Sequence, residues 1–365
     1  MVKVYVQSPK WFLRPRNTDW RIPRFTIPRM TEFVSDCVIY LAQSNFTVFD
    51  TNLRYARGMI CQKLRIPINH EVGPAIDRRE FARSRCNVVY SHDHFPRNAS
   101  SIPIIWQNSI LDPEMTLARG YSREHLAREQ EIKQKGFQEA AAVHVHTEAE
   151  RKRLSDWFPE CADKFVCVPY LVPDISPIAP DQLQRKLERT GPLRFLFVGH
   201  EARRKGLAKV YAAMERLPAS LQNRIQLTVV SGQADGPVAA PSLPNLEVTG
   251  AKPHREVVEL MLKSDVFLMP SQFESFGIVY LEAMAQGTIP VVPNWEAQRE
   301  IVDDGKAGII ASGDTGDLAA SLERLCEDAE FRIGLATSAR QRFETHFMPS
   351  IVAEKYSRLF HRAAI

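Results

Sequence analysis

Short apolar runs alternate with polar and amphipathic stretches along the whole chain. The runs that predict buried strands occupy residues 3–7, 46–49, 87–90, 102–106, 141–146, 164–173, 193–199, 225–230, 245–250, 266–269 and 289–292. A helix is predicted over residues 33–42, because Phe33, Cys37 and Leu41 share one helical face. Strands that alternate with helices are typical of an α/β fold built on parallel sheets.

Residues 266–293 carry the clearest pattern in the chain. A buried strand over 266–269 is followed by a turn, a helix from about 276 to 285 that ends at Gly287, and a second buried run over 289–292. In such a βαβ unit the first loop lies at the carboxyl edge of a parallel sheet. Open α/β folds bind their ligands at that edge, so we expect a ligand site here.

Two acids flank the start of this helix. Glu282 lies inside the apolar run 278–285, where a carboxylate is costly unless it is hydrogen-bonded, and no cation lies within one turn of it. A ligand hydroxyl is therefore its expected partner. At ~1.5 Å per residue, Glu282 lies roughly 7 Å beyond Gly277 along the helix axis, which suits a ligand with phosphate at one end and a diol at the other. The four residues that follow Glu274 would present unpaired backbone N–H groups at the positive end of the helix, where they could bind an anion or sugar oxygens. They are Ser275, Phe276, Gly277 and Ile278.

The two acids resemble the signature of retaining glycosyltransferases of family 4, which have the GT-B fold. Seven residues separate Glu274 from Glu282, within Pro-Ser, Phe-Gly and Glu-Ala-Met-Ala surroundings. The resemblance implies that Glu274 and the main chain after it bind the donor sugar, and that Glu282 binds the ribose of the nucleotide. It also implies two Rossmann-like domains with parallel sheets facing a cleft, and a terminal helix crossing back to the amino-terminal domain.

A basic loop follows the strand that ends at Gly199. Arg203, Arg204 and Lys205 crowd this loop, where fixed cations suit a pyrophosphate, although the residues alone equally fit a solvated basic turn. The resemblance favours the phosphate role, because family members carry Lys-Gly at the position of Lys205 and the glycine after it. It leaves the role of His200 open, since arginine is commonest there.

Polar residues end three strands of the amino-terminal half. A metal site is not indicated by their spacing, and a structural histidine is the favoured interpretation for each histidine among them. Members of the family commonly place a histidine near the donor sugar at the second of these strand ends, where this chain has Gln107 and Asn108. Contacts with the acceptor or the donor sugar are therefore open to His92, His94 and Asn108.

Residues 8–29 are rich in arginine, proline and tryptophan, with Asp19 as the one acidic counter-charge. Two readings stay open. The segment is a solvated loop, or it is an acceptor loop that contacts an anionic lipid headgroup or a glycan, with a peripheral membrane contact through its aromatic side chains. The glycine-rich turn that family members carry in this region is absent, so acceptor contacts cannot be transferred.

Composition limits the remaining classes. The 365 residues suggest two domains, and 44% apolar residues is ordinary for a globular chain. A net charge of +4 is too small to indicate nucleic-acid binding, and six scattered cysteines show no metal-ligand spacing. We expect a cytoplasmic protein with an acceptor-binding domain at 1–175, a donor-binding domain at 176–345 and a helix at 346–365 that packs back on the first domain.

The expected activity is that of a retaining hexosyltransferase. It would move a sugar from a nucleotide diphosphate sugar, such as a UDP- or GDP-sugar, to a hydroxyl of a glycan or lipid-linked acceptor in polysaccharide or glycoconjugate biosynthesis, with no metal or other cofactor. Lys205 and Arg204 would offset the charge of the leaving group, and Glu274 would orient the sugar. The alternatives are a phosphorylase or nucleotide-sugar epimerase on the same fold, and a non-catalytic nucleotide-sugar binding module.

Overall fold

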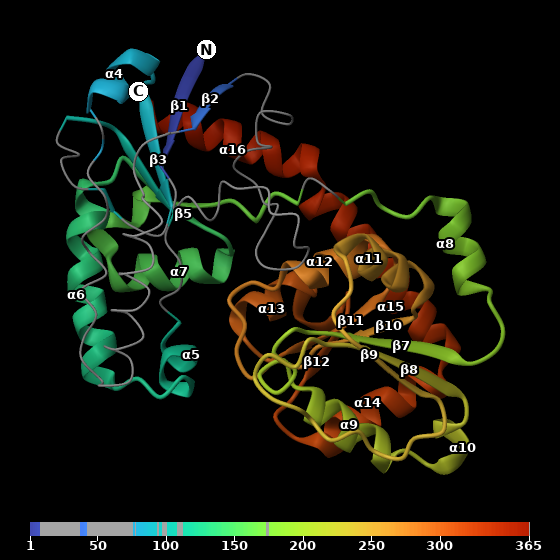
Figure 1. Cartoon of the computed structure of the whole chain (residues 1–365). Coiled ribbons are helices and arrows are strands. Elements are labelled where there is room, and N and C mark those ends of the chain that lie inside the picture. Colours follow the sequence, from blue (N-terminus) through green and yellow to red (C-terminus); the bar gives the residue numbers. More distant parts are fainter. Residues whose placement is uncertain are drawn as a thin grey trace. The chain divides into compact units, whose positions relative to one another are not determined.

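The computed structural model of the chain describes residues 1–7, 37–41, 76, 78–92, 95–96, 101–107, 112–172 and 175–364. They divide into two compact units (Figure 1). The first holds the described residues up to 172 together with 349–364, and the second holds residues 175–348. Among the described residues, we find no helix with the length and apolar character that a bilayer crossing requires.

The first unit is built on a parallel sheet with the order β2-β1-β3-β4-β5-β6. The order reverses between β1 and β3, as in flavodoxin-like folds. Its described strands are β1 Val2–Gln7, β2 Cys37–Leu41, β3 Val88–His92, β4 Ile104–Gln107, β5 Ala142–Val145 and β6 Phe165–Cys167. Its described helices are α4 Arg78–Ser84, α5 Pro113–Ala118, α6 Arg123–Glu139, α7 Glu148–Trp157, the short η1 Pro159–Lys164 and α16 Pro349–Ala363.

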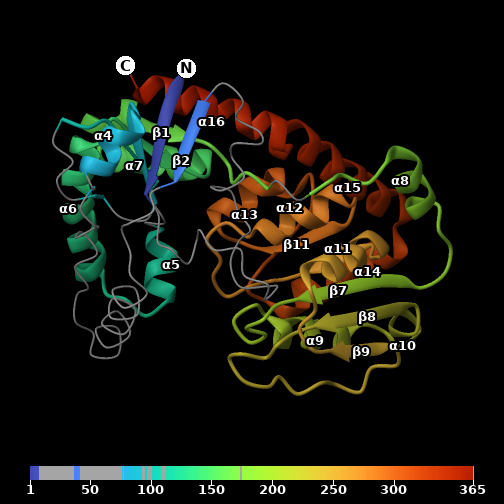
Figure 2. The ribbon, with the colours of Figure 1, turned by 45° about the horizontal axis from the view of Figure 1, so that its top comes forward.

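Alternation along β1 divides the core of this unit between the two faces of the sheet. Val4 packs with Tyr356 and Phe360 of α16, whereas Tyr5 faces the opposite cluster with Phe137 of α6. The ring of Tyr90, on β3, meets that of Phe360 edge-on at 5.9 Å. The final helix is thus an integral layer of the first unit (Figure 2).

The helix predicted over residues 33–42 is wrong for residues 37–41. Those residues form β2, which pairs in parallel with β1 in a register that places Ile39 beside Val4. The sequence Cys-Val-Ile-Tyr-Leu is rich in β-branched and aromatic residues, and its pairing with β1 overrides the helical spacing of its apolar positions. The strand predicted over 46–49 lies outside the described residues.

The second unit is built on a parallel sheet with the order β12-β11-β10-β7-β8-β9. Numbered from β7, this is the doubly wound order 3-2-1-4-5-6, whose switch point lies between β7 and β10. The strands are β7 Leu193–Val198, β8 Ile225–Val230, β9 Leu246–Thr249, β10 Val266–Leu268, β11 Ile289–Pro293 and β12 Ile309–Ala311. The helices are α8 Pro180–Leu187, α9 Leu207–Arg216, α10 Ala219–Gln222, α11 His254–Lys263, α12 Ile278–Ala285, α13 Glu296–Ile301, η2 Asp303–Gly305, α14 Thr315–Glu327, α15 Ala329–Arg342 and η3 Phe343–Phe347.

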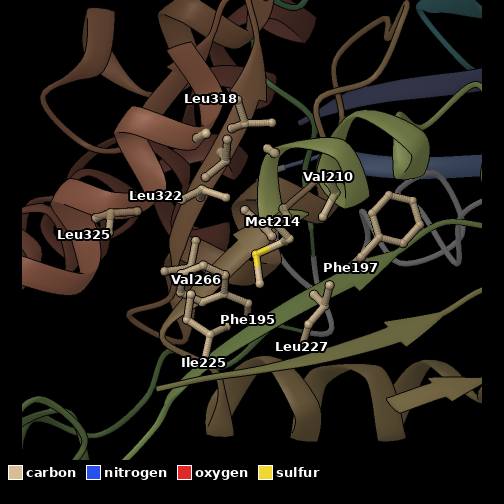
Figure 3. Packing of buried hydrophobic residues seen from close by; sticks show 14 of the residues in the cluster. Phe195, Phe197, Val210, Met214, Ile225, Leu227, Val266, Leu318, Leu322 and Leu325 are labelled. Carbon is tan, nitrogen blue, oxygen red and sulfur yellow. The ribbon is translucent and has the colours of Figure 1, made fainter. Parts of the chain in front are cut away.

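Helices cover both faces of this sheet, with α9 and α14 on one face and α11, α12 and α15 on the other (Figure 1). Phe195 of β7 and Val266 of β10 are buried against Met214 of α9 and Leu322 of α14 (Figure 3). This packing holds the central strands, and therefore the loops at their carboxyl ends, in fixed positions.

Candidate active site

The basic loop and the first acid meet at the switch point of the second sheet. Neighbouring strands β7 and β10 end at Val198 and Leu268, and the loops after them carry Lys205 and Glu274. Lys205 Nζ donates a hydrogen bond to Glu274 Oε2 across 69 positions of sequence. The side chains are 16% and 12% exposed, so this ion pair is largely shielded from water but reachable from it.

Arg204 ties the two loops together. Its Nη1 donates to the Phe273 carbonyl at 3.0 Å and lies 4.0 Å from Glu274 Oε2, while its guanidinium carbon lies 5.2 Å from the centre of the Phe273 ring. Its Nε and Nη2 donate to Glu201 Oε2 at 3.0 and 2.6 Å. The Gln272 N–H donates to the Arg204 carbonyl at 2.8 Å. Arg204 is therefore a fixed positive charge beside Lys205.

Asp235, in the loop after β8, supports the basic loop from a third strand end. Its carboxylate accepts hydrogen bonds from the backbone N–H groups of Arg203 at 3.2 Å and Arg204 at 2.8 Å. The Ala234 N–H also donates to the His200 carbonyl at 2.8 Å. Sequence reasoning did not identify Asp235. The sequence offered only the residue type as an indication, since aspartate side chains often accept hydrogen bonds from backbone N–H groups in turns.

Two glycines allow the loops to approach each other. Gly206 has φ +88°, and a Cβ at this position would overlap the carbonyl oxygen of Pro270. Gly277 has φ +83°, and a Cβ there would overlap the ring of Tyr280 and lie 3.1 Å from Glu274 Cγ. Each helix beside the site, α9 or α12, thus begins directly after a left-handed glycine.

The acidic loop, which carries Glu274 between β10 and α12, is held in place by two buried side chains. Gln298 of α13 is fully buried and its Nε2 donates to the Phe276 carbonyl at 2.7 Å. Tyr280 OH donates to the Met269 carbonyl at 2.7 Å. Burial raises the pKa of Tyr280 well above its usual range, and the charge of Glu274 adds to the effect, so the phenol remains a neutral donor. Helix α12 starts at Ile278, two residues later than expected, and Ser275 is exposed at its approach.

Glu282 has a protein partner that sequence spacing did not reveal. His254 Nε2, from the first residue of α11, lies 2.7 Å from Glu282 Oε1, and the Glu282 side chain is 9% exposed. The two residues are 28 positions apart, so no local pattern links them. Glu282 therefore already has one hydrogen-bond partner within the protein, and a ligand hydroxyl as a further partner stays a prediction.

The other predicted site residues are Gly199, His92, His94 and Asn108. Gly199 directly follows β7, and its N–H donates to the Val230 carbonyl at 3.0 Å. His92 is the last residue of β3 in the first unit, and its side chain is outside the described part of the structure. His94, Asn108 and the segment 8–29 also lie outside the described residues.

Two histidines of the first unit belong to a buried hydrogen-bond network. His144 Nε2 lies 2.7 Å from the Val168 carbonyl, and its Nδ1 lies 2.8 Å from Tyr90 OH. His146 Nε2 lies 2.9 Å from Gln107 Nε2. These hydrogen bonds are consistent with structural roles for both rings at the carboxyl edge of the first sheet.

Sequence comparison relates the second unit to a known protein family. Residues 179–342 match the family model of glycosyl transferases group 1. The chain is 30% identical over 178 residues to a glycogen synthase of Mycobacterium tuberculosis, which covers 47% of this chain and 43% of that protein. It is 32% identical over 174 residues to a phosphatidyl-myo-inositol mannosyltransferase of Mycolicibacterium smegmatis, covering 45% and 44%. The chain thus spans less than half the length of these relatives.

Solved structures share the fold of almost the whole chain. A sucrose-phosphate synthase from Thermosynechococcus elongatus superposes with a TM-score of 0.66 at 14% identity, covering 99% of this chain and 98% of that chain. HepE of Anabaena, solved in complex with UDP, gives a TM-score of 0.61 at 14% identity, covering 98% and 99%. These likenesses confirm the expected GT-B fold, with two α/β units on parallel sheets. The second unit carries a glycosyltransferase group 1 domain.

Proposed function

We propose that the chain transfers a sugar, with retention of anomeric configuration, from a nucleotide diphosphate sugar to a hydroxyl of a glycan or lipid-linked acceptor. The observation that carries this proposal is the meeting of Lys205 with Glu274 at the switch point of the second sheet, beside Arg204 and the amino end of α12. Ligands of doubly wound sheets bind at that point.

Each part of the donor has a matching group in this site. Lys205 and Arg204 supply positive charge for the diphosphate, and the amino end of α12 adds its partial charge. Glu274 accepts from the hydroxyls of the donor sugar, together with the main chain at residues 275–278. Glu282 lies further along the same helix and accepts from the ribose.

Breaking the bond between the sugar and the diphosphate develops negative charge on the leaving oxygen. Lys205 Nζ offsets this charge, and donors placed in advance of the reaction are commonly the largest catalytic contribution. In the free protein the same ammonium group is paired with Glu274, so the incoming diphosphate competes for it. The leaving phosphate takes the proton of the acceptor hydroxyl, and no separate protein base is assigned.

Among the relatives, a mannosyltransferase and glycogen synthase support transfer to lipid-linked or glycan hydroxyls, and HepE with UDP supports a uridine donor. We therefore place the reaction in polysaccharide or glycoconjugate biosynthesis, with the acceptor assigned to the first unit. The basic aromatic segment 8–29 is proposed as its peripheral membrane contact, and the protein as cytoplasmic.

A donor panel tests the proposal. UDP-, GDP- and ADP-sugars are added separately, and a donor at about 100 times its Kd should add about 2.7 kcal/mol to the free energy of unfolding. The stabilising donor is then incubated with candidate acceptors, and NMR of the product reports the anomeric configuration. Consumption of inorganic phosphate would indicate a phosphorylase, a free epimer would indicate an epimerase, and binding without turnover would indicate a binding module.

A further inference from the structure

A histidine from a neighbouring helix holds one oxygen of Glu282. His254 Nε2 lies 2.7 Å from Glu282 Oε1. An ionised carboxylate only accepts hydrogen bonds, so the proton in this contact is on Nε2 of the histidine. A hydrogen bond to a charged acceptor is about twice as strong as a neutral one.

Both side chains are carried by packed helices rather than by loops. Helix α11 contacts α12, and its Val257 and Met261 are buried. Residues 280–285 of α12 are all buried. The His254 side chain is 24% exposed and that of Glu282 is 9% exposed, so the contact lies at the edge of the protein interior. Groups placed by rigid elements hold their geometry more closely than groups on loops.

We propose that His254 is a positioning residue for ribose recognition, and this inference rests on the proposed function of Glu282. By donating to Oε1, His254 fixes the rotation of the carboxylate and leaves Oε2 for the ligand. The vicinal 2′- and 3′-hydroxyls of a ribose both donate hydrogen bonds, so they match an oriented carboxylate oxygen. The ligand class recognised here is a nucleoside diphosphate with an intact ribose diol.

The test measures binding to the full chain by calorimetry, separately from turnover. The probe is whichever of UDP, GDP and ADP binds the wild type most tightly, together with its 2′,3′-dideoxy counterpart. Loss of the diol should weaken binding to the wild type by about tenfold or more, as expected for hydrogen bonds to a charged group. In His254→Phe, the diphosphate should bind about tenfold more weakly and the preference for the diol should shrink towards onefold.

Two further variants separate positioning from general damage. In His254→Gln the side-chain amide nitrogen reaches the place of Nε2, so affinity and diol preference should largely return. The shorter His254→Asn should behave like His254→Phe. The control is His125→Phe, which removes another histidine beside a glutamate, 3.7 Å from Glu129 in the first unit, and should leave binding unchanged.

Three results would overturn the inference. Unchanged or tighter binding of the diphosphate to His254→Phe would show that the histidine is a bystander or a blocking group. Equal weakening of the ribose and dideoxy ligands would show a structural role alone. If none of the three diphosphates binds the wild type, the proposed function itself fails, whereas binding to the wild type with an unaffected His254→Phe removes only the role of His254.

Discussion

Lys205 and Glu274 form an ion pair between loops that follow adjacent parallel strands, 69 positions apart in the sequence. Their contact joins the basic loop and the acidic loop in one site within the second unit. The catalytic assignment depends on this pairing, because the charge that would stabilise a leaving diphosphate and the carboxylate that would hold the sugar converge there.

Lys205→Ala should lower kcat by about 10² to 10³, the range found when one donor to a developing charge is removed. Release of the nucleoside diphosphate during transfer measures this loss. The matched control is Lys306→Ala, which removes a 76% exposed lysine that pairs with Asp303 at 3.1 Å. Near-normal turnover of Lys205→Ala would contradict the assignment, as would an equal loss in both variants.

Asp235→Ala should raise KM for the donor by about tenfold, because the carboxylate that holds the backbone of Arg203 and Arg204 is removed. Loss of a comparable cap on backbone N–H groups costs about 0.5–2 kcal/mol. Asp235→Asn keeps one acceptor oxygen and should show a smaller change. Initial rates at varied donor concentration measure both variants, and a KM that stays at the wild-type value in Asp235→Ala would show that the loop keeps its shape without this support.

Gly206→Ala should destabilise the protein by more than Gly191→Ala. Both glycines have positive φ, at +88° and +107°, so each substitution carries a backbone cost of about 1–2 kcal/mol. A Cβ at Gly206 also overlaps the Pro270 carbonyl, whereas a Cβ at Gly191 meets nothing within 4 Å. Urea unfolding compares the two variants, and equal losses would show that the loop beside Gly206 yields freely.

Lys186 should make the stability of the protein depend on pH. Burial lowers the pKa of its ammonium to about 7, although its Nζ donates to the Gln286 carbonyl at 2.8 Å and to Thr288 Oγ1 at 2.7 Å. Between about pH 7 and its usual value of 10.5, the unfolded chain binds more protons at this site than the folded chain does. The cost of burying the charge is therefore complete below about pH 7, and stability rises as the pH increases through this window.

The comparison variant is Lys186→Met, whose unbranched side chain is one atom shorter and cannot titrate. Between pH 7 and 9 the wild type should gain free energy of unfolding relative to Lys186→Met, by less than about 1.4 kcal/mol per pH unit, the limit for one proton. Denaturant unfolding at several pH values measures the difference. Parallel profiles for the two proteins would show that the Lys186 ammonium keeps its ordinary pKa.

The sequence predicted helices and strands that are marked by a local pattern of apolar residues. It missed contacts between elements that lie far apart in the sequence. The strand, loop, helix and strand of residues 266–293 were predicted, because each apolar run lies on buried strands or a buried helix. Helix α12 starts two residues late because Gly277 adopts a left-handed conformation that excludes Phe276 from the helix. Residues 37–41 were assigned wrongly, since their pairing with β1 depends on a partner far away in sequence.

The same reasoning applies to the site. The meeting of Lys205 and Glu274 follows from the rule that parallel strands end at one edge, once their strands are neighbours. The contacts of His254 with Glu282 and of Asp235 with Arg204 depend instead on helix packing and on a loop of β8, and neither has a sequence spacing that marks it.

The hydrogen bonds between Arg204 and residues 272–273 make the two loops one interdependent unit. A graft of residues 199–206 alone that replaces Arg204 would remove the side-chain donor of the Phe273 carbonyl, and one that changes the backbone path would displace the residue 204 carbonyl that accepts from the Gln272 N–H. Engineering of donor preference in this scaffold should therefore exchange residues 199–206 and 269–277 together, as a matched pair.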